Sequence, residues 1–183
     1  IRNIVYASSI SVYSDLRLLP WKESQPISPV SCYGISKAVG EYLADIYHNK
    51  YGLNIKSLRL APVFGLRDKM EFMIDIFLNN AMRKDKLTVI GKSQAKREFI
   101  YVKDVVRAIL LSLKRYDLHG GINIGSGECY NNLEIARMIC DSFNNRDNIE
   151  YIDDVNEEIQ SSYMDIGKAW TTIFYKPKYS FLK

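Results

Sequence analysis

The feature that most constrains this chain is a strand–helix–strand pattern over its first 60 residues. Residues 3–7 are β-branched and aromatic, which is typical of a short buried strand, and residues 55–60 form the next strand. Between them, apolar residues recur with helical spacing after Ile35, and Gly52 marks the end of the helix. A strand, a crossover helix and a second strand predict parallel pairing with a right-handed connection, and hence an α/β fold.

The apolar positions of this predicted helix form one stripe along its length. They are Ala38, Val39, Tyr42, Leu43, Ile46 and Tyr47. Such a stripe is typical of a helix that packs one face on a core. The preceding residues, 14–31, form a loop because three prolines exclude regular structure, namely Pro20, Pro26 and Pro29.

Helices and strands also alternate in the rest of the chain. Apolar spacing predicts a helix from Phe72, a helix capped by Asp104, and a helix at Asn131, where Glu134 completes a capping box. Short apolar runs predict three more strands, at residues 87–90, 99–102 and 121–124. The polar residues 144–162 predict a mobile connection, and the last twenty residues show no clear pattern.

Composition excludes several classes of protein. The 183 residues are 47% hydrophobic and 25% charged, which are ordinary globular values. The net charge of +4 comes from scattered bases, so we expect no nucleic-acid partner, and no apolar run approaches the 18 residues that a membrane span needs. The three cysteines and two histidines have no metal-ligand spacing, so no metal site is expected. Three cysteines cannot all be joined in disulfides, which fits a reducing cytoplasm.

Tyr33 and Lys37 lie four residues apart, and therefore on one face of the predicted helix. An unperturbed phenol has a pKa of about 10, so about one in a thousand is ionised at neutral pH. A lysine one turn away stabilises phenolate, and a phenol tuned in this way can exchange a proton with a carbinol or carbonyl oxygen. The spacing alone is weak evidence, because Tyr179 and Lys183 repeat it at the C-terminus. A tyrosine and a lysine on a helix surface are the alternative.

Five motifs in a fixed order carry a family resemblance. They are Ser8-Ser9-Ile10-Ser11-Val12-Tyr13, Tyr33-Gly34-Ile35-Ser36-Lys37, Leu58-Arg59-Leu60-Ala61-Pro62-Val63-Phe64-Gly65, Arg97-Glu98-Phe99-Ile100-Tyr101-Val102-Lys103-Asp104-Val105 and Asn123-Ile124-Gly125-Ser126-Gly127. Together they resemble the extended short-chain dehydrogenase/reductase family, the NAD-dependent epimerases and dehydratases of nucleotide sugars. The resemblance implies part of a Rossmann-like doubly wound parallel sheet, followed by a smaller α/β substrate-binding region.

The resemblance also implies a role for each matching residue. The catalytic residues would be Ser9, Tyr33 and Lys37. The cofactor, NAD or NADP, would be bound by Ala7, Ser8, Tyr33, Lys37, Ala61, Pro62 and Val63. A nucleotide-sugar substrate would be bound by Ser9, Tyr33, Pro62 and Arg97, with the arginine on its diphosphate. The resemblance further implies a homodimer or another form of self-association.

The chain departs from the family pattern at three places. Ile10 and Ser11 stand where sugar 4,6-dehydratases carry an Asp-Glu pair, which favours an epimerase or reductase over a dehydratase. Pro62 stands where many nucleotide-sugar enzymes carry an asparagine. No glycine-rich Gly-x-x-Gly-x-x-Gly turn for the cofactor pyrophosphate is present.

We therefore expect the C-terminal part of a longer enzyme. Residues 1–66 would be the second half of the dinucleotide-binding domain, and residues 67–183 mainly the substrate-binding region, with 99–125 returning to the first sheet. The alternative is a catalytically inactive module that acts in folding or protein interaction only.

Overall fold

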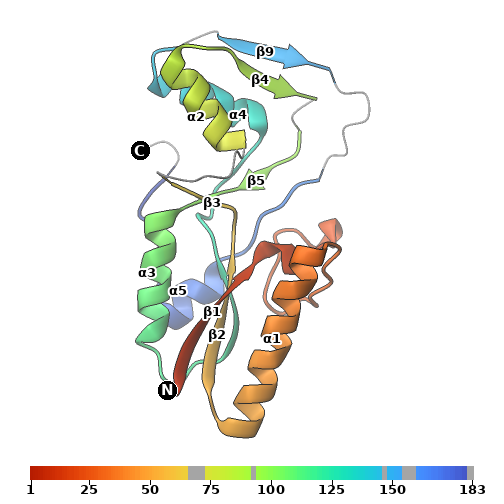
Figure 1. The fold of residues 1–183 in the computed structure, drawn as a ribbon, viewed down its shortest axis with the longest axis vertical. Helices are drawn as coiled ribbons and strands as arrows, with labels where there is room; N and C mark the ends of the chain where they lie inside the picture. The colour runs from red at the N-terminus through yellow and green to blue at the C-terminus, as the bar shows by residue number, and fades with distance from the viewer. Residues whose placement is uncertain (66–72, 92–93, 146–147, 154–159, 181–183) are drawn as a thin grey trace.

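The computed structural model describes residues 1–65, 73–91, 94–145, 148–153 and 160–180. A three-stranded parallel sheet forms the lower half of the molecule in Figure 1, with strand order β1 (Asn3–Ser9), β2 (Asn54–Leu60) and β7 (Gly120–Ile124). Ala7 pairs with Leu58, and Leu58 pairs with Ile122, so the three strands are in register at their centres. The predicted parallel α/β fold is confirmed.

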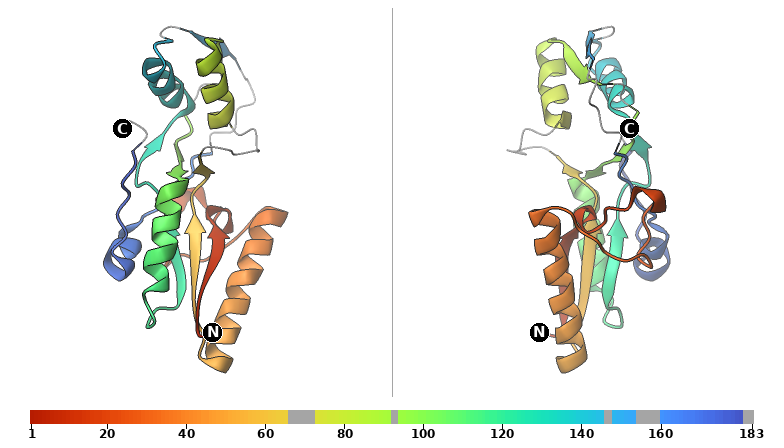
Figure 2. Two further views of the ribbon diagram at one scale, coloured as in Figure 1. Left: turned by 60° about the vertical axis from the view of Figure 1, so that its left-hand side comes forward. Right: turned by 90° about the vertical axis from the view of Figure 1, so that its right-hand side faces the viewer.

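Helices cover both faces of this sheet (Figures 1 and 2). Helix α1 (Cys32–Tyr51) packs on one face, and α3 (Val102–Leu113) with α5 (Gly167–Ile173) packs on the other. The short helices η1 (Ile10–Val12) and η2 (Leu16–Leu18) lie in the loop before α1. The buried core of this lobe includes Val12, Leu58, Ile100, Ala108, Ile122, Ile124, Ala169 and Tyr175.

A second, smaller lobe stands above the sheet in Figure 1. It contains α2 (Met73–Arg83), α4 (Asn132–Ser142) and the parallel pair β4 (Leu87–Ile90) and β9 (Ile149–Ile152). Its core is formed by Ile74, Phe77, Ala81, Leu87, Val89, Ile135, Ala136, Ile139 and Cys140. Two short pairs connect the lobes, β3 (Val63–Phe64) with β6 (Ile100–Tyr101) and β5 (Arg97–Glu98) with β8 (Cys129–Tyr130).

The predicted ends of two helices are confirmed. Gly52 adopts the left-handed conformation (φ 65°) and its N–H donates to the carbonyl of His48, which terminates α1. Asn131 and Glu134 form the predicted capping box at the start of α4. The start of α1 lies earlier than the apolar pattern indicated, because Ser31 accepts the N–H of Gly34 and caps the helix there.

Apart from Ala38, the apolar stripe of α1 faces solvent, contrary to its interpretation as a packing face. Val39, Tyr42 and Ile46 are 49%, 53% and 55% exposed, whereas the buried positions of the helix are Gly34, Ala38, Glu41 and Ala44. Small residues face the sheet because the helix runs close to β1. A Cβ placed on Gly40 would lie 2.3 Å from the ring of Tyr6. Large side chains are therefore displaced to the outer face.

Two further predictions are wrong. Residues 99–102 are not one strand, because β5 ends at Glu98, β6 covers only Ile100–Tyr101, and Val102 already begins α3. Asp104 is no cap but a buried residue, 1% exposed, inside the first turn of α3. Its carboxylate accepts the guanidinium of Arg107 and the backbone N–H groups of two residues of the C-terminal segment, Lys178 and Tyr179.

The polar stretch 144–162 is in part a strand, since β9 pairs residue by residue with β4. The last twenty residues include α5. Phe72 and the expected domain boundary between residues 66 and 67 lie outside the described residues. Among the helices that the structure describes, none is both long and apolar enough to cross a membrane.

Candidate active site at the carboxyl end of the sheet

The first turn of α1 lies at the edge of the sheet where the parallel strands end (Figure 1). In open α/β sheets, ligands bind at this carboxyl edge. Strand β1 ends there at Ser9, and β2 ends at Leu60, just before Ala61. The chain backbone is close-packed at this point, because a Cβ on Gly34 would lie 2.2 Å from the carbonyl oxygen of Ser11.

Tyr33, Lys37 and Ala7 come together at this edge. The Nζ of Lys37 donates a 2.9 Å hydrogen bond to the carbonyl oxygen of Ala7 on β1. The same Nζ lies 5.5 Å from the ring centroid of Tyr33 and 5.6 Å from that of Tyr6. The side chain of Tyr33 is 56% exposed and is open to a ligand. A cation held by the strand beside an accessible phenol is an arrangement that can move a proton.

Ser9 lies close by but forms local hydrogen bonds. It is 7% exposed, its Oγ accepts the N–H of Ser11 at 3.1 Å, and the two Oγ atoms are 3.2 Å apart. Within the described part of the chain, no recorded contact joins Ser9 to Tyr33. The serine caps η1 and would have to turn its hydroxyl toward a substrate to take part in catalysis.

A buried polar network supports this edge of the sheet. The Ser8 hydroxyl donates to Glu41 at 2.5 Å, and Glu41 forms an ion pair with Arg59 at 2.7 Å. Arg59 also donates to the hydroxyl of Tyr13 at 2.5 Å, and Tyr13 donates to Asn123 at 2.9 Å. The network therefore connects α1 with all three strands of the sheet.

Burial and neighbouring charges shift the pKa values of Tyr13 and Arg59 in this network in opposite directions. Burial raises the pKa of Tyr13, and the cation of Arg59 opposes that rise. Burial alone would lower the pKa of Arg59, but its contacts with Glu41 and Tyr13 outweigh this effect and raise the pKa. Sequence reasoning missed Glu41. The available signal was a charged residue near the end of a buried strand, Arg59, because a buried charge requires a partner.

The other predicted site residues lie at or above the same edge. Ala61 is 1% exposed and its N–H donates to the carbonyl of Ile124, whereas Pro62 is exposed. Val63 begins β3. Arg97 lies on β5, between the lobes, with its side chain exposed.

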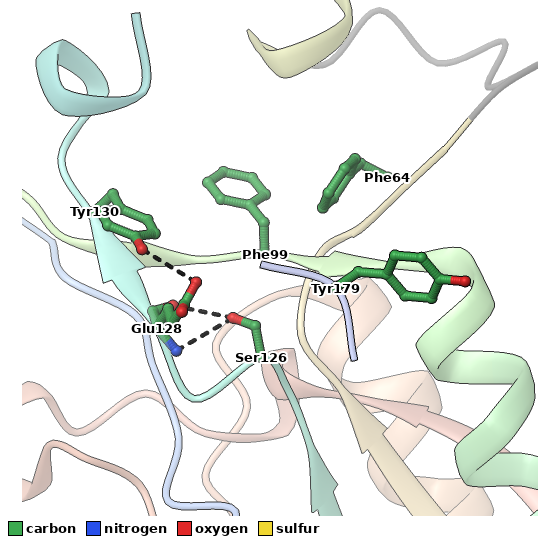
Figure 3. Close-up of a pocket in the computed structure, with 6 residues that line it drawn as sticks. All are labelled: Phe64, Phe99, Ser126, Glu128, Tyr130 and Tyr179. Carbon is green, nitrogen blue, oxygen red and sulfur yellow. Dashed lines mark hydrogen bonds between the residues drawn. The ribbon is translucent and has the colours of Figure 1, made fainter. Parts of the chain in front are cut away.

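Two hollows in the described part of the chain are not lined by Ser9, Tyr33 or Lys37. Figure 3 shows a cavity of about 10 Å³, too small for more than a single water molecule, lined by Phe64, Phe99, Ser126, Glu128, Tyr130 and Tyr179. An open hollow of about 590 Å³ is lined by Lys22, Glu23, Ser24, Asp165, Gly167, Lys168 and Thr171. It lies beside β7, where Lys168 donates to the carbonyl of Gly121, and β2 separates it from β1.

The described residues contain no cluster of three or more side chains that could hold a metal ion. The cation of Lys37 and the neighbouring phenol suit the ribose and nicotinamide end of a dinucleotide. The sequence has no glycine-rich turn that would hold a pyrophosphate. The site therefore fits the reacting end of the cofactor and leaves its phosphates without the usual turn.

Residues 1–125 match the model of the NAD dependent epimerase/dehydratase family. The chain belongs to this family. Among curated proteins, it is similar to an uncharacterized UDP-glucose epimerase of Bacillus subtilis, with 30% identity over 97% of this chain and 56% of the relative. It is also similar to UDP-glucuronic acid decarboxylase 1 of Danio rerio, with 29% identity over 95% of this chain and 43% of the relative.

Two crystal structures from Bacillus cereus show the same fold. The UDP-N-acetylglucosamine 4-epimerase has a TM-score of 0.92 and 41% identity over 100% of this chain and 61% of the other. The UDP-glucuronic acid 4-epimerase, solved with UDP-glucuronic acid and NAD, has a TM-score of 0.83 and 27% identity over 97% of this chain and 57% of the other. The chain thus spans about half the length of these relatives.

Proposed function

We propose that these residues form the catalytic and substrate-binding part of an NAD(P)-dependent nucleotide-sugar epimerase, or of a reductase that uses half of the same cycle. The observation that carries the proposal is the Lys37 ammonium, bound to the carbonyl of Ala7 and 5.5 Å from the ring centroid of Tyr33. The membership of the chain in the family and the UDP-sugar relatives support it.

In this proposal, Tyr33 accepts the proton of a sugar hydroxyl and later returns it to the same oxygen. Lys37 stabilises the phenolate by its charge. Ser9 orients the reacting oxygen with its hydroxyl, once that hydroxyl has turned from Ser11. A bound nicotinamide supplies the hydride acceptor and donor. In an epimerase the sugar ketone rotates in the site between the two hydride transfers, whereas a reductase carries out only the second transfer, from the reduced nicotinamide to the ketone.

The proposed substrate is a UDP-sugar, since the similar epimerases and the similar decarboxylase are all named for UDP-sugars. Arg97 is the proposed partner of its diphosphate, because a guanidinium binds phosphate oxygens in pairs. Pro62 has no N–H to donate, and its carbonyl already accepts the N–H of Ile100, so its side chain offers the sugar an apolar contact. The nicotinamide end of the cofactor is proposed to contact Ala7, Ser8, Ala61, Pro62 and Val63.

A chimeric enzyme tests the proposed chemistry. The chain is joined behind the N-terminal part of the Bacillus cereus UDP-N-acetylglucosamine 4-epimerase, which supplies the part of the relative that this chain does not span. We expect turnover of UDP-N-acetylglucosamine with NAD, and we expect Tyr33→Phe to abolish it while binding of NAD is unchanged. Tyr51→Phe, at the opposite end of α1, is the control. Turnover in the Tyr33→Phe enzyme would refute the assignment.

The exposed stripe of α1 favours a second candidate, an inactive module that associates with itself or another protein. Val39, Tyr42 and Ile46 are each about half exposed on one helix. Sedimentation velocity should show a dimer that Ile46→Lys converts to a monomer. If the Ile46→Lys variant is still a dimer, the stripe of α1 is not the dimer interface.

Cofactor binding distinguishes the two candidates. Because the chain lacks the glycine-rich turn, nicotinamide fluorescence should show weak or no binding of NADH by these 183 residues alone. Micromolar binding would contradict the interpretation that the pyrophosphate site lies outside them.

A further inference from the structure

Glu98 is a buried charged side chain to which the proposed chemistry gives no role. It is 1% exposed and lies on β5, directly after Arg97. Among the described residues, no ion pair of Glu98 is recorded. A buried carboxylate without a cation is costly unless hydrogen-bond donors satisfy its oxygens.

The donors of Glu98 are backbone N–H groups from two distant segments. Gly127 donates to Oε1 at 2.8 Å, and Met164 donates to Oε2 at 2.9 Å. Burial raises the pKa of the Glu98 carboxyl, and the N–H groups of Met164, Gly127 and Ser126 oppose this rise because they favour the ionised form. The carboxylate thus joins β5 to the turn after β7 and to the segment that contains Met164.

The turn after β7 is shaped around this carboxylate. A Cβ on Gly125 would lie 2.0 Å from Oε1 of Glu98, so only glycine fits there. The hydroxyl of the fully buried Tyr175 also donates to the carbonyl of Gly125, at 2.9 Å. The turn lies at the carboxyl edge of the sheet, the edge at which Tyr33 is placed.

The fixed position of Glu98 on β5 also determines the direction of its neighbour Arg97. Neighbouring residues of a strand point to opposite sides, so the inward position of Glu98 directs Arg97 outward. Arg97 is exposed, and its backbone pairs with Tyr130 on one side and Ser162 on the other. The N–H of Glu98 donates to the carbonyl of Ser162 at 3.0 Å.

We propose that Glu98 is a positioning residue for Arg97: its carboxylate locks β5 onto the turn after β7, which holds the guanidinium at the carboxyl edge of the sheet, where it meets a nucleoside diphosphate. This role rests on the proposed function, since it takes Arg97 as the partner of the substrate diphosphate. Glu98 itself touches no substrate and acts through its neighbour.

The test is a titration of the 183-residue chain with UDP, followed by ¹H–¹⁵N NMR. Glu98→Gln keeps the shape but replaces one acceptor oxygen by an NH₂ group that opposes an N–H donor. We expect Arg97→Ala to weaken UDP binding at least tenfold and Glu98→Gln to weaken it about five- to tenfold. The double variant should bind no more weakly than Arg97→Ala, because Glu98 acts only through Arg97.

Glu128→Gln is the matched control. Glu128 is a neighbouring carboxylate whose Oε2 accepts the hydroxyls of Tyr130 and Ser180, so its loss should leave UDP affinity unchanged. Without nucleotide, the amides of Gly127 and Met164 should exchange hydrogen faster in Glu98→Gln than in the wild type, and at the wild-type rate in Glu128→Gln.

Each contrary outcome has a distinct meaning. Unchanged UDP affinity or unchanged amide exchange in Glu98→Gln overturns the positioning role alone. A further loss of affinity from Glu98→Gln in the Arg97→Ala background also overturns it, because the effect would not pass through Arg97. A wild-type chain that does not bind UDP, or binds it equally after Arg97→Ala, refutes the proposed function of Arg97 and the role of Glu98 with it.

Discussion

Removing the Glu41 side chain should destabilise this protein more than removing an exposed ion pair would. The side chains of Glu41 and Arg59 are 7% and 8% exposed, and their charged atoms are 2.7 Å apart. In Glu41→Ala the guanidinium stays buried without its counter-ion, and Ser8 loses its acceptor. Breaking a buried pair in this way costs about 3–5 kcal/mol. The free energy of unfolding of a domain of this size is about 5–15 kcal/mol, so this loss is a large part of the total stability.

Urea denaturation followed by far-ultraviolet circular dichroism measures the effect. Glu41→Gln keeps an acceptor for Arg59 and Ser8, so it should lose less stability than Glu41→Ala. Arg17→Ala is the control, because it removes an exposed pair with Asp15, in which Arg17 is 88% exposed, and should cost far less stability than Glu41→Ala. A loss below about 1 kcal/mol in Glu41→Ala would show that water solvates Arg59, and would refute the argument from burial.

Two substitutions and one titration test other parts of the structure. Tyr175→Phe leaves the buried carbonyl of Gly125 without its donor and should lower the free energy of unfolding by about 1–2 kcal/mol in the same urea assay. Gly40→Ala places a methyl group against the ring of Tyr6 on β1 and should lower the free energy of unfolding by about 1–3 kcal/mol. An unchanged free energy of unfolding would contradict this close approach. The pKa of Asp15 is lowered to about 2 by hydrogen bonds from Arg17, so its stabilising contribution is present above pH 3.8 and is lost as the pH falls toward 2. Carbon NMR should show this pKa rising toward 3.8 in Arg17→Ala.

Local chemistry made several elements predictable. Gly52 ends α1 because glycine adopts the left-handed conformation freely, and the capping box of Asn131 and Glu134 requires only residues three positions apart. The position of Tyr33 and Lys37 on one face follows from the helical repeat alone. The parallel pairing of β1 and β2 follows from the length of the connection between them.

Other features depended on neighbours that no local pattern reveals. The hydrophobic stripe of α1 predicted its packing face incorrectly, because the face toward β1 is formed by small residues and by Glu41, which binds Ser8 and Arg59. The prediction of Asp104 as a cap is wrong because two of its three partners, Lys178 and Tyr179, lie more than 70 residues further on, in the C-terminal segment.

The sequence by itself determined the fold class, the family motifs and the tyrosine–lysine pair, since each depends on residues close together in the chain. Only the tertiary structure decided which groups support that pair and how Arg97 is held. The Ser8–Glu41–Arg59 network and the backbone donors of Glu98 join segments that lie 18 to 66 residues apart in the chain. Burial gives these contacts their strength, and burial exists only once the chain has folded.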